Sequence, residues 1–247
     1  MNECYVPDWA VPANVRVLQT TRHGGVSRGP WAGFNLGDHV GDDAAAVTAN
    51  RAALAARLPG EPFWLTQVHG TVAVDVDQGP KSWEADAAVA RQTGNVCAVM
   101  TADCLPVLLC DRRGTVVAAA HAGWRGLHAG VLETTVGAMK VPPGDLLAWL
   151  GPAIGPRCFE VGEEVRDAFV TGDPAASAGF VAQGPGKWLC DLYLLARQRL
   201  QRLGVTMIGG GGSCTVTEAD RYYSYRRDGV TGRMASLIWL AHPASGV

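Results

Sequence analysis

Short apolar runs alternate irregularly with segments of helical spacing along the whole chain of 247 residues. The runs that we interpret as strands are 63–68, 96–102, 105–110, 115–120, 146–150, 205–208 and 236–240. Helical spacing or helix caps mark 42–58, 124–140, 162–170 and 191–203. Because the alternation is not a regular strand–helix–strand repeat, it predicts one α+β domain over residues 1–247, with mixed sheets and the helices outside them.

Charge and cysteine usage narrow the class of protein. The chain has 21 basic and 23 acidic side chains, and this balance argues against binding to nucleic acid or to an anionic membrane. Uncharged apolar stretches fall far short of the ~20 residues of a membrane span. Seven cysteines without a C-x-x-C pair, and no leader-like N-terminus, favour reduced thiols and a cytoplasmic location.

Three residues with metal-binding chemistry share one placement. His69, Cys104 and His121 each stand at or just past the end of a predicted strand. Two imidazoles and a thiolate suit zinc, and three protein ligands leave a fourth position for water or substrate. Strand ends that meet at one edge of a sheet would bring these distant residues together.

The spacing alone leaves a simpler explanation open. Gaps of 34 and 16 residues between the three positions match no local zinc motif. Isolated histidines and a buried cysteine are more often ordinary core or surface residues. The Gly-rich segment 209–212 is expected to be a loop, and it lacks the Lys-Ser/Thr that follows in a phosphate-binding loop.

Longer motifs around these residues resemble one family over nearly the whole chain. They are TRHGGVS (21–27), NLGDHVGD (35–42), QVHG (67–70), ADCLP (102–106), HAGWRG (121–126), GPAIG (151–155), YSYRRDG (223–229) and TGRM (231–234). In these motifs and their order the chain resembles the YfiH family, also called the laccase-domain or polyphenol-oxidase family. The candidate ligands show no departure from that pattern.

The resemblance implies a fold and an activity. The fold is a single α/β/β/α layered domain similar to the catalytic domain of cytotoxic necrotizing factor toxins. The site is a zinc ion held by His69, Cys104 and His121. The activity is phosphorolysis of adenosine, inosine and methylthioadenosine, with adenosine deamination as a second reaction. A zinc-bound water fits the deamination, because the metal lowers the pKa of that water toward ~7.

Phosphorolysis also needs a phosphate-binding site. The turn 121–126 offers glycines that let the backbone approach an anion, a helix N-terminus, and the guanidinium of Arg125. The ordinary alternative is a tight strand-to-helix turn with a solvated Arg125. Asp103 is either a turn residue or an orienting partner for a ligand. Further polar candidates for ribose or phosphate are Arg22, Asn35, Arg51 and Gln67.

Two other activities remain open. Other family members are described as copper-dependent phenol oxidases, and copper binds N and S ligands more tightly than zinc. A conventional multicopper laccase is excluded, since its trinuclear cluster alone takes roughly eight imidazoles and the chain has six histidines. The second alternative is a cysteine hydrolase that edits peptidoglycan precursors, with Cys104 as nucleophile and His121 as base. The oligomeric state is not predicted.

Overall fold

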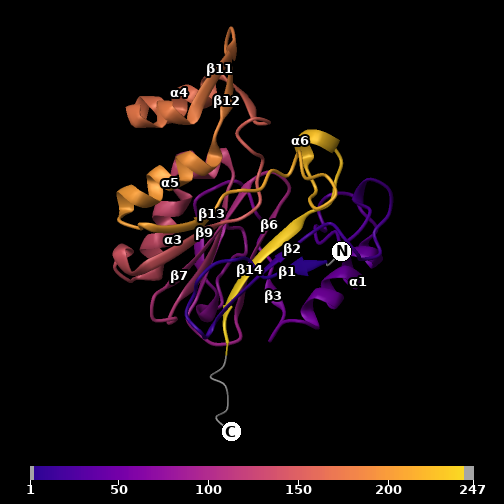
Figure 1. Ribbon diagram of the computed structural model, residues 1–247. Coiled ribbons are helices and arrows are strands. Elements are labelled where there is room, and N and C mark those ends of the chain that lie inside the picture. The colour runs from indigo at the N-terminus through magenta and orange to yellow at the C-terminus, as the bar shows by residue number, and fades with distance from the viewer. Residues whose placement is uncertain (1–2, 242–247) are drawn as a thin grey trace.

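Two mixed β-sheets lie face to face in the computed structural model, which describes residues 3–241 (Figure 1). The six-stranded sheet has the order β13 (Met207–Gly210), β9 (Leu146–Leu150), β7 (Leu105–Asp111), β8 (Val117–Ala122), β5 (Ala87–Ala90), β4 (Ala73–Asp75). The five-stranded sheet has the order β1 (Cys4–Tyr5), β2 (Val15–Thr20), β14 (Met234–Leu240), β6 (Val96–Thr101), β3 (Pro62–Phe63). Both sheets mix parallel and antiparallel pairs.

Helices cover the outer faces of both sheets, and a small third sheet projects beyond them. The α-helices are α1 (Ala44–Ala55), α2 (Trp124–Ala129), α3 (Val131–Met139), α4 (Glu163–Gly172), α5 (Leu192–Leu203) and α6 (Tyr225–Asp228). Short 3₁₀ helices are η1 (Gly29–Trp31), η2 (Val76–Gln78), η3 (Pro143–Asp145) and η4 (Pro174–Gly179). The third sheet joins β10 (Glu160–Gly162), β12 (Lys187–Cys190) and β11 (Phe180–Gly184), which stand at the top of Figure 1.

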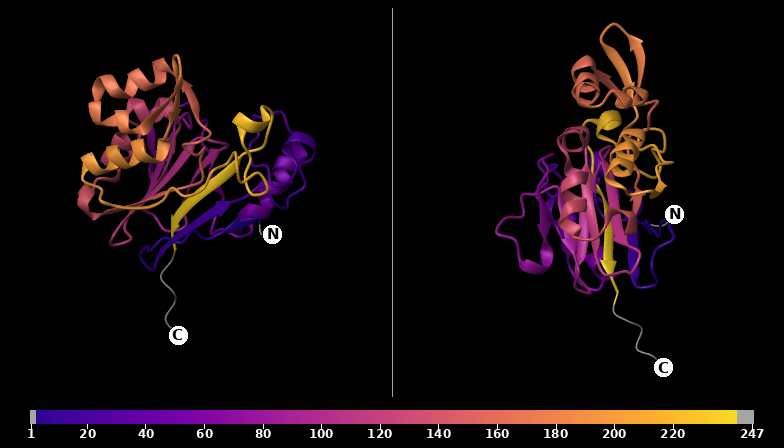
Figure 2. Two further views of the ribbon diagram at one scale, coloured as in Figure 1. Left: turned by 45° about the horizontal axis from the view of Figure 1, so that its top comes forward. Right: turned by 90° about the vertical axis from the view of Figure 1, so that its left-hand side faces the viewer.

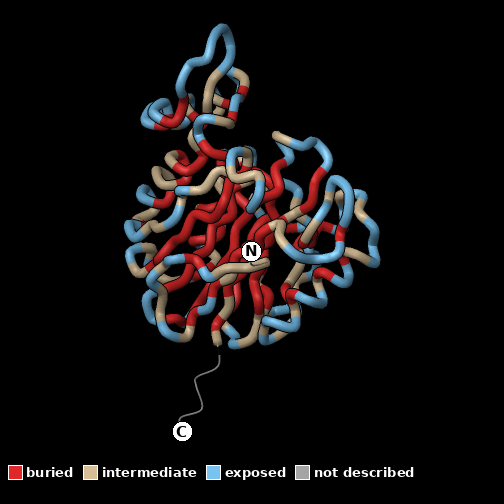
Figure 3. The backbone as a smooth tube through the Cα atoms, turned by 45° about the vertical axis from the view of Figure 1, so that its right-hand side comes forward, coloured by how far each residue is buried: buried red, intermediate tan, exposed pale blue. Residues whose placement is uncertain are grey.

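Three apolar layers hold this arrangement together. Side chains such as Val99, Leu108 and Ile238 fill the space between the two sheets. The outer face of the six-stranded sheet packs against α3 and α5, while Leu54 of α1 packs on the outer face of the five-stranded sheet. Figure 2 shows the helices on opposite sides of the paired sheets, and Figure 3 shows the buried strands between exposed loops. The α/β/β/α layering implied by the family resemblance is therefore confirmed.

Helix boundaries follow the capping residues. Asp43 accepts a hydrogen bond from the backbone N–H of Ala45 and begins α1, and Asp191 accepts one from Leu194 and begins α5. Gly204, with φ 95°, ends α5. The helix predicted over 124–140 is wrong in one respect, because Gly130 takes φ 105° and divides it into α2 and α3.

Two strand predictions also need correction. The strand predicted over 63–68 is confined to β3, and the following residues run as an irregular segment. The loop predicted over 209–212 is half strand, because Gly209 and Gly210 pair with Trp149 and Leu150 of β9. Strands β1, β2, β4 and β5 and the three strands of the third sheet were not anticipated from the sequence. The predicted domain, 1–247, includes residues 1–2 and 242–247, which lie outside the described part of the chain. No helix among the described residues is long and apolar enough to cross a membrane.

Candidate metal centre

Three adjacent strands bring chemically active residues to one edge of the six-stranded sheet. Cys104 lies in the short connection before β7, and His121 is the last residue but one of β8. The antiparallel register places Pro106 opposite His121, so Cys104 and His121 meet at that edge. Asp86 immediately precedes β5, and its carbonyl accepts the backbone N–H of His121 at 2.7 Å. The predicted convergence of Cys104 and His121 at a sheet edge is therefore confirmed.

His69 reaches the same edge by another route. It does not follow a strand, contrary to the sequence interpretation, and lies in the irregular segment after β3 with φ 61°. The carboxylate of Asp86 holds this segment, because it accepts the backbone N–H groups of Val68, His69 and Gly70 at 3.3, 2.9 and 2.6 Å. A left-handed conformation is rare for a residue with a side chain, and these three bonds compensate for its strain.

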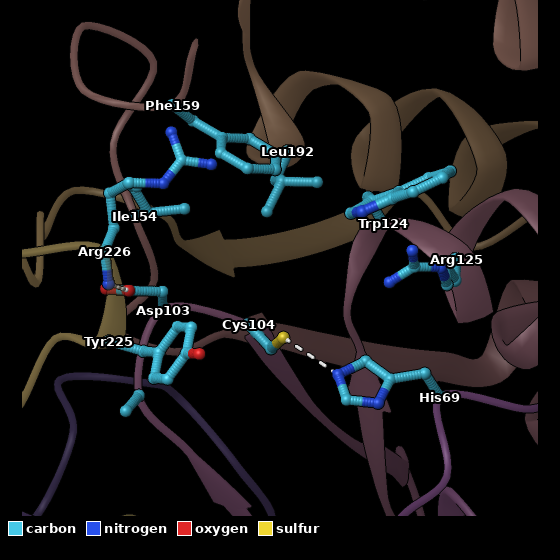
Figure 4. A pocket seen from close by; sticks show the side chains of 11 residues that line it. His69, Asp103, Cys104, Trp124, Arg125, Ile154, Phe159, Leu192, Tyr225 and Arg226 are labelled. Carbon is cyan, nitrogen blue, oxygen red and sulfur yellow. Dashed lines mark hydrogen bonds between the residues drawn. The ribbon is translucent and has the colours of Figure 1, made fainter. Parts of the chain in front are cut away.

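The donor atoms of His69, Cys104 and His121 form a compact group. They all lie within 4.8 Å of one another, and Sγ of Cys104 is 3.7 Å from Nε2 of His69 (Figure 4). Two ligands of a tetrahedral zinc, one sulfur and one nitrogen, stand about 3.6 Å apart when the metal–ligand bonds have their usual lengths. The residues present thus fit a tetrahedral metal ion that keeps one open position.

His121 is oriented by a partner on its far side. Its Nδ1 lies 2.8 Å from Oδ1 of Asp86, and both side chains are almost completely buried. With Nδ1–H donated to the carboxylate, Nε2 is left as the metal-binding or proton-accepting atom. Carboxylate partners of this kind fix the tautomer of a metal-binding histidine and raise its basicity.

The ionised forms of Cys104, His121 and Asp86 stabilise one another. Burial opposes ionisation of Cys104, but His121 and His69 outweigh it and lower the pKa of the thiol to about 6. Burial likewise opposes protonation of His121, but the Cys104 thiolate and Asp86 raise the pKa of this imidazole to about 9. Burial would raise the pKa of Asp86, yet the bonds from His121 and Gly70 hold it below its usual range. The site is therefore built around a thiolate, which is the form that binds metals or attacks substrates.

Two glycines of the turn 121–126 serve the packing of this centre. A Cβ on Gly123 would lie 2.8 Å from Sγ of Cys104 and 3.0 Å from Cδ2 of His69. A Cβ on Gly126 would lie 2.9 Å from the carbonyl oxygen of Gly70. Both glycines therefore allow the ligand-bearing segments to approach one another closely. The helix that follows, α2, has only six residues, so its dipole adds little.

One cavity of about 310 Å³ opens directly on His69 and Cys104. Aromatic rings of Trp124, Phe159 and Tyr225 line it, and Figure 4 shows them around the cysteine with the guanidinium groups of Arg125 and Arg226. Two cations and three rings around a metal-binding group favour a ligand that is anionic at one end and flat at the other.

A second cavity, of about 400 Å³, lies against all three members of the group. Its other lining residues include Gln67, Met100 and Arg233. Trp64 and Arg51 line a further hollow that shares Gln67 and Met100 with it. The metal-binding group thus borders two cavities, which is enough room for two reactants.

The polar residues predicted to bind ribose or phosphate differ in their location and in their contacts. Arg125 lies in the first cavity, where its guanidinium stacks on Trp124 at 4.7 Å and has no hydrogen-bond partner among the described residues. Gln67 lines the second cavity, but both ends of its amide bond to the backbone of Met100 at 2.7 and 2.8 Å. Arg51 stacks on Trp64 at 4.4 Å and donates to the carbonyl of Leu36. Of these three residues, Arg125 is the one whose side-chain donors all lack a partner in the described part of the chain.

Arg22 and Asn35 lie away from the cavities around the metal-binding group. Arg22 stacks on Tyr223 and donates to the carbonyl of Ala219. Asn35 is completely buried, and its amide carbonyl accepts the backbone N–H of Arg233 at 2.8 Å. We infer that both are structural, and that Asn35 positions the segment that carries Arg233.

Sequence reasoning missed Asp86 and gave no role to Arg226 or Tyr225. The available signal for Asp86 was a single acid in the apolar run 85–90, which needs a partner once buried. Asp103 proves to be a turn residue with φ 96°. Its carboxylate accepts the hydroxyl of Thr215 and the backbone N–H of Arg226, each at 2.6 Å, so it anchors the segment that carries Arg226 and Tyr225.

Comparison with known proteins gives consistent matches. A family model described as multi-copper polyphenol oxidoreductase laccase matches residues 16–241. A purine nucleoside phosphorylase of Pseudomonas aeruginosa is 56% identical over 97% of this chain and 99% of its own. The purine nucleoside phosphorylase YfiH of Escherichia coli is 55% identical over 97% of this chain and all of its own.

Solved structures agree with this assignment. A Neisseria meningitidis protein is 54% identical and superposes with a TM-score of 0.94, over 98% of this chain and all of its own. YlmD from Geobacillus stearothermophilus is 33% identical with a TM-score of 0.83, over 93% of each chain. With the layered fold and the His–Cys–His group in place, these matches show that the chain belongs to the YfiH family of laccase-like proteins.

Proposed function

We propose that the chain is a zinc-dependent purine nucleoside phosphorylase acting on adenosine, inosine and methylthioadenosine, with adenosine deamination as a side reaction. The observation that carries this proposal is the compact His69–Cys104–His121 group between two cavities, in a chain 55–56% identical to proteins named purine nucleoside phosphorylase. We further propose that residues 1–247 form one domain and that the protein works in the cytoplasm.

The three ligands suit zinc by their chemistry. Zinc prefers nitrogen and sulfur donors in a tetrahedron, and the fit of the sulfur–nitrogen distance supports this choice. When bound, zinc supplies a Lewis acid and a water of lowered pKa for attack on the purine ring in deamination. Copper could occupy the same ligands, but no other group of three or more His, Cys, Asp and Glu residues in the described part of the chain could hold a metal ion. This supports a single metal site rather than a multicopper centre.

The chain's own residues would position the reactants. Arg125 and Arg226 present guanidinium groups to the first cavity, where they would bind phosphate and bring its oxygen toward C1′ of the ribose. The rings of Trp124, Phe159 and Tyr225 offer apolar faces to a flat base. The new bond joins hydrogen phosphate to C1′, the bond from C1′ to the purine nitrogen breaks, and the departing base takes the proton that hydrogen phosphate loses on becoming the ester. Asp86 holds His121 through Nδ1 so that the site stays fixed during this exchange.

Product analysis tests the proposal. Adenosine should yield adenine and ribose 1-phosphate in phosphate buffer, with some inosine, and the free base should be nearly absent in a non-phosphate buffer. Inosine and methylthioadenosine provide parallel substrates. Equal yields of free base in both buffers would show hydrolysis and would overturn the phosphorylase assignment.

A specific observation favours cysteine hydrolysis as the second candidate. Cys104, His121 and Asp86 are linked in the order nucleophile, base and orienting carboxylate, and the pKa of the thiol is lowered to about 6. Such a constellation could cleave an amide in a peptidoglycan precursor without a metal. His69 has no role in that mechanism, although Asp86 fixes its backbone as firmly as it fixes His121. This arrangement is why the metal-dependent assignment is preferred.

A further inference from the structure

A second pair of cysteines lies behind the wall of the first cavity. Cys158 and Cys214 are half-buried, and Cys214 is near enough to Cys158 to affect its ionisation. Both line a cavity of about 250 Å³ that also includes Arg157, Gly211 and Gly212. Ile154 and Phe159, on either side of this segment, line the cavity of the metal-binding group instead. The two cavities therefore share a wall without sharing their cysteines.

Local backbone structure brings the two cysteines together. Cys214 forms a parallel β-bridge with Ala153, so the segment around it runs beside residues 153–155. The backbone N–H of Cys158 donates to the carbonyl of Gly155 at 3.0 Å, which turns the chain back toward Cys214. A Cβ on Gly155 would lie 2.9 Å from Cβ of Cys214. The absent side chain at Gly155 permits this close approach.

The two thiols differ in their chemical environment. Sγ of Cys214 accepts the backbone N–H of Gly155 at 3.2 Å. Burial opposes its ionisation, but the bonds from Thr217, and then those from Gly155 and Val216, outweigh burial and lower the pKa of Cys214. Burial and the neighbouring Cys214 raise the pKa of Cys158. Cys214 is thus the better nucleophile, and Cys158 stands next to it as the resolving thiol.

We propose that Cys158 and Cys214 form a reversible disulfide when the protein meets a hydroperoxide, which makes this cavity a thiol-oxidation site separate from the metal centre. The Cys214 thiolate attacks one peroxide oxygen, the O–O bond breaks, and the alcohol or water that leaves takes a proton. The Cys158 sulfur then attacks the resulting sulfenic acid, and hydroxide leaves with the Cys158 proton as water. Two thiols and one hydroperoxide give one disulfide, one alcohol or water, and one further water.

The remaining described cysteines are poor competitors for this reaction. Cys97, Cys110 and Cys190 are completely buried, and burial raises the pKa of each. Cys4 is half-buried, and burial raises its pKa as well. Cys104 belongs to the metal-binding group, where a bound metal ion would protect it. The pair Cys158–Cys214 is the one in which a lowered pKa and an adjacent second thiol occur together outside that group.

Peptide mapping of zinc-loaded protein under non-reducing conditions tests the proposal. After exposure to hydrogen peroxide, we expect two free thiols to be lost, one cross-linked peptide joining Cys158 to Cys214, and full recovery of both thiols with dithiothreitol. Cys158→Ser and Cys214→Ser should lack the cross-link, whereas Cys190→Ser, the matched control, should form it. Cys104→Ala should also form it, since the site does not depend on the metal.

The wild-type map is decisive even if a variant fails to fold. Retention of all thiols under peroxide that oxidises free glutathione in the same tube would overturn the proposal. A cross-link that joins Cys104 or any other cysteine to one of the pair would overturn it equally. Neither result depends on nucleoside phosphorolysis, so the disulfide proposal and the phosphorylase proposal are tested independently.

Discussion

The carboxylate of Asp86 bonds Nδ1 of His121 at 2.8 Å and, with the same two oxygens, the backbone N–H groups of three residues around His69. One buried acid thus positions two of the three candidate metal ligands. Its placement just before β5, beside β8, is a consequence of strand order in the six-stranded sheet. Cys104 lies just before β7, the neighbour of β8 on its other side.

Replacing this acid should weaken metal binding. Asp86→Asn cannot accept all of the N–H groups as a carboxylate does, so His121 loses its fixed orientation and the segment around His69 loses its anchor. Loss of such an orienting partner typically costs about 10–100-fold in metal affinity. Titration against a competing zinc chelator measures the affinity.

Asp111→Asn is the matched control for that experiment. Asp111 is also buried, and it accepts backbone N–H groups of Thr115 and Val116 at 2.6 and 3.0 Å, far along β7 from the ligands. The Asp111→Asn substitution should lower the free energy of unfolding while leaving zinc affinity unchanged. Equal zinc affinity in Asp86→Asn and Asp111→Asn would contradict the role assigned to Asp86.

Asp111 also makes stability depend on pH in a defined direction. Burial would raise the pKa of Asp111, but the bonds from Val116 and Thr115 hold it below its usual value. A lowered folded-state pKa contributes stability that is complete above the unfolded-state value of about 3.9 and is lost as the pH falls through the folded-state pKa. The difference in unfolding free energy between wild type and Asp111→Asn should therefore shrink below about pH 4. Denaturant unfolding at neutral and acid pH measures it, and a constant difference would show that the carboxylate charge is irrelevant.

A methyl group at Gly123 should disturb the centre directly. In Gly123→Ala the new Cβ meets Sγ of Cys104 and Cδ2 of His69, so both ligands must shift. We expect a loss of zinc affinity of at least about tenfold, which is the effect of ~1.4 kcal/mol. Gly137→Ala, in α3, is the control because its Cβ meets nothing within 4 Å, and it should raise stability by about 0.5–1 kcal/mol. If Gly123→Ala binds zinc as wild type does, the observed packing around the ligands is not needed for binding.

Arg125→Ala and Arg22→Ala should differ in their KM for phosphate. Arg125→Ala removes unused donors from the first cavity, and we expect KM for phosphate to rise about tenfold, the loss of one charge-assisted hydrogen bond. Arg22→Ala removes a side chain that stacks on Tyr223 outside the cavities around the metal-binding group, so KM for phosphate should not change. Initial rates at fixed nucleoside and varied phosphate distinguish them. A similar rise in both variants would place the phosphate elsewhere.

Local signals in the sequence predicted most helices and most of the buried strands, but not the fully buried β5. Asp43, Asp191 and Gly204 are caps whose effect depends on neighbours a few residues away, so their helices were predicted correctly. The segment 63–68 has strand-like residues, but the amide of Gln67 pairs with Met100, and Asp86 takes the backbone N–H groups that follow. Both partners are distant in sequence, so no local pattern revealed them.

The same distinction applies to the site. Cys104 and His121 were placed correctly because the apolar runs beside them are true neighbouring strands. His69 was assigned to the site on its chemistry and its motif, although the strand expected to run up to it ends at Phe63. Arg22, Asn35 and Arg51 were chosen as polar residues within motifs, and the structure gives each of them a partner that spacing does not encode.

The most direct test of the zinc-dependent mechanism compares the zinc content and activity of the wild type, before and after chelation, with those of His69→Ala. Nucleoside phosphorolysis should require one bound zinc per chain, should be lost on exhaustive chelation, and should return when zinc is added. His69→Ala should bind little zinc and be nearly inactive, since ligands of one ion act as a unit. The contrary result would be an active chelated protein and an active His69→Ala beside an inactive Cys104→Ala, which would make Cys104 a nucleophile and the metal mechanism wrong.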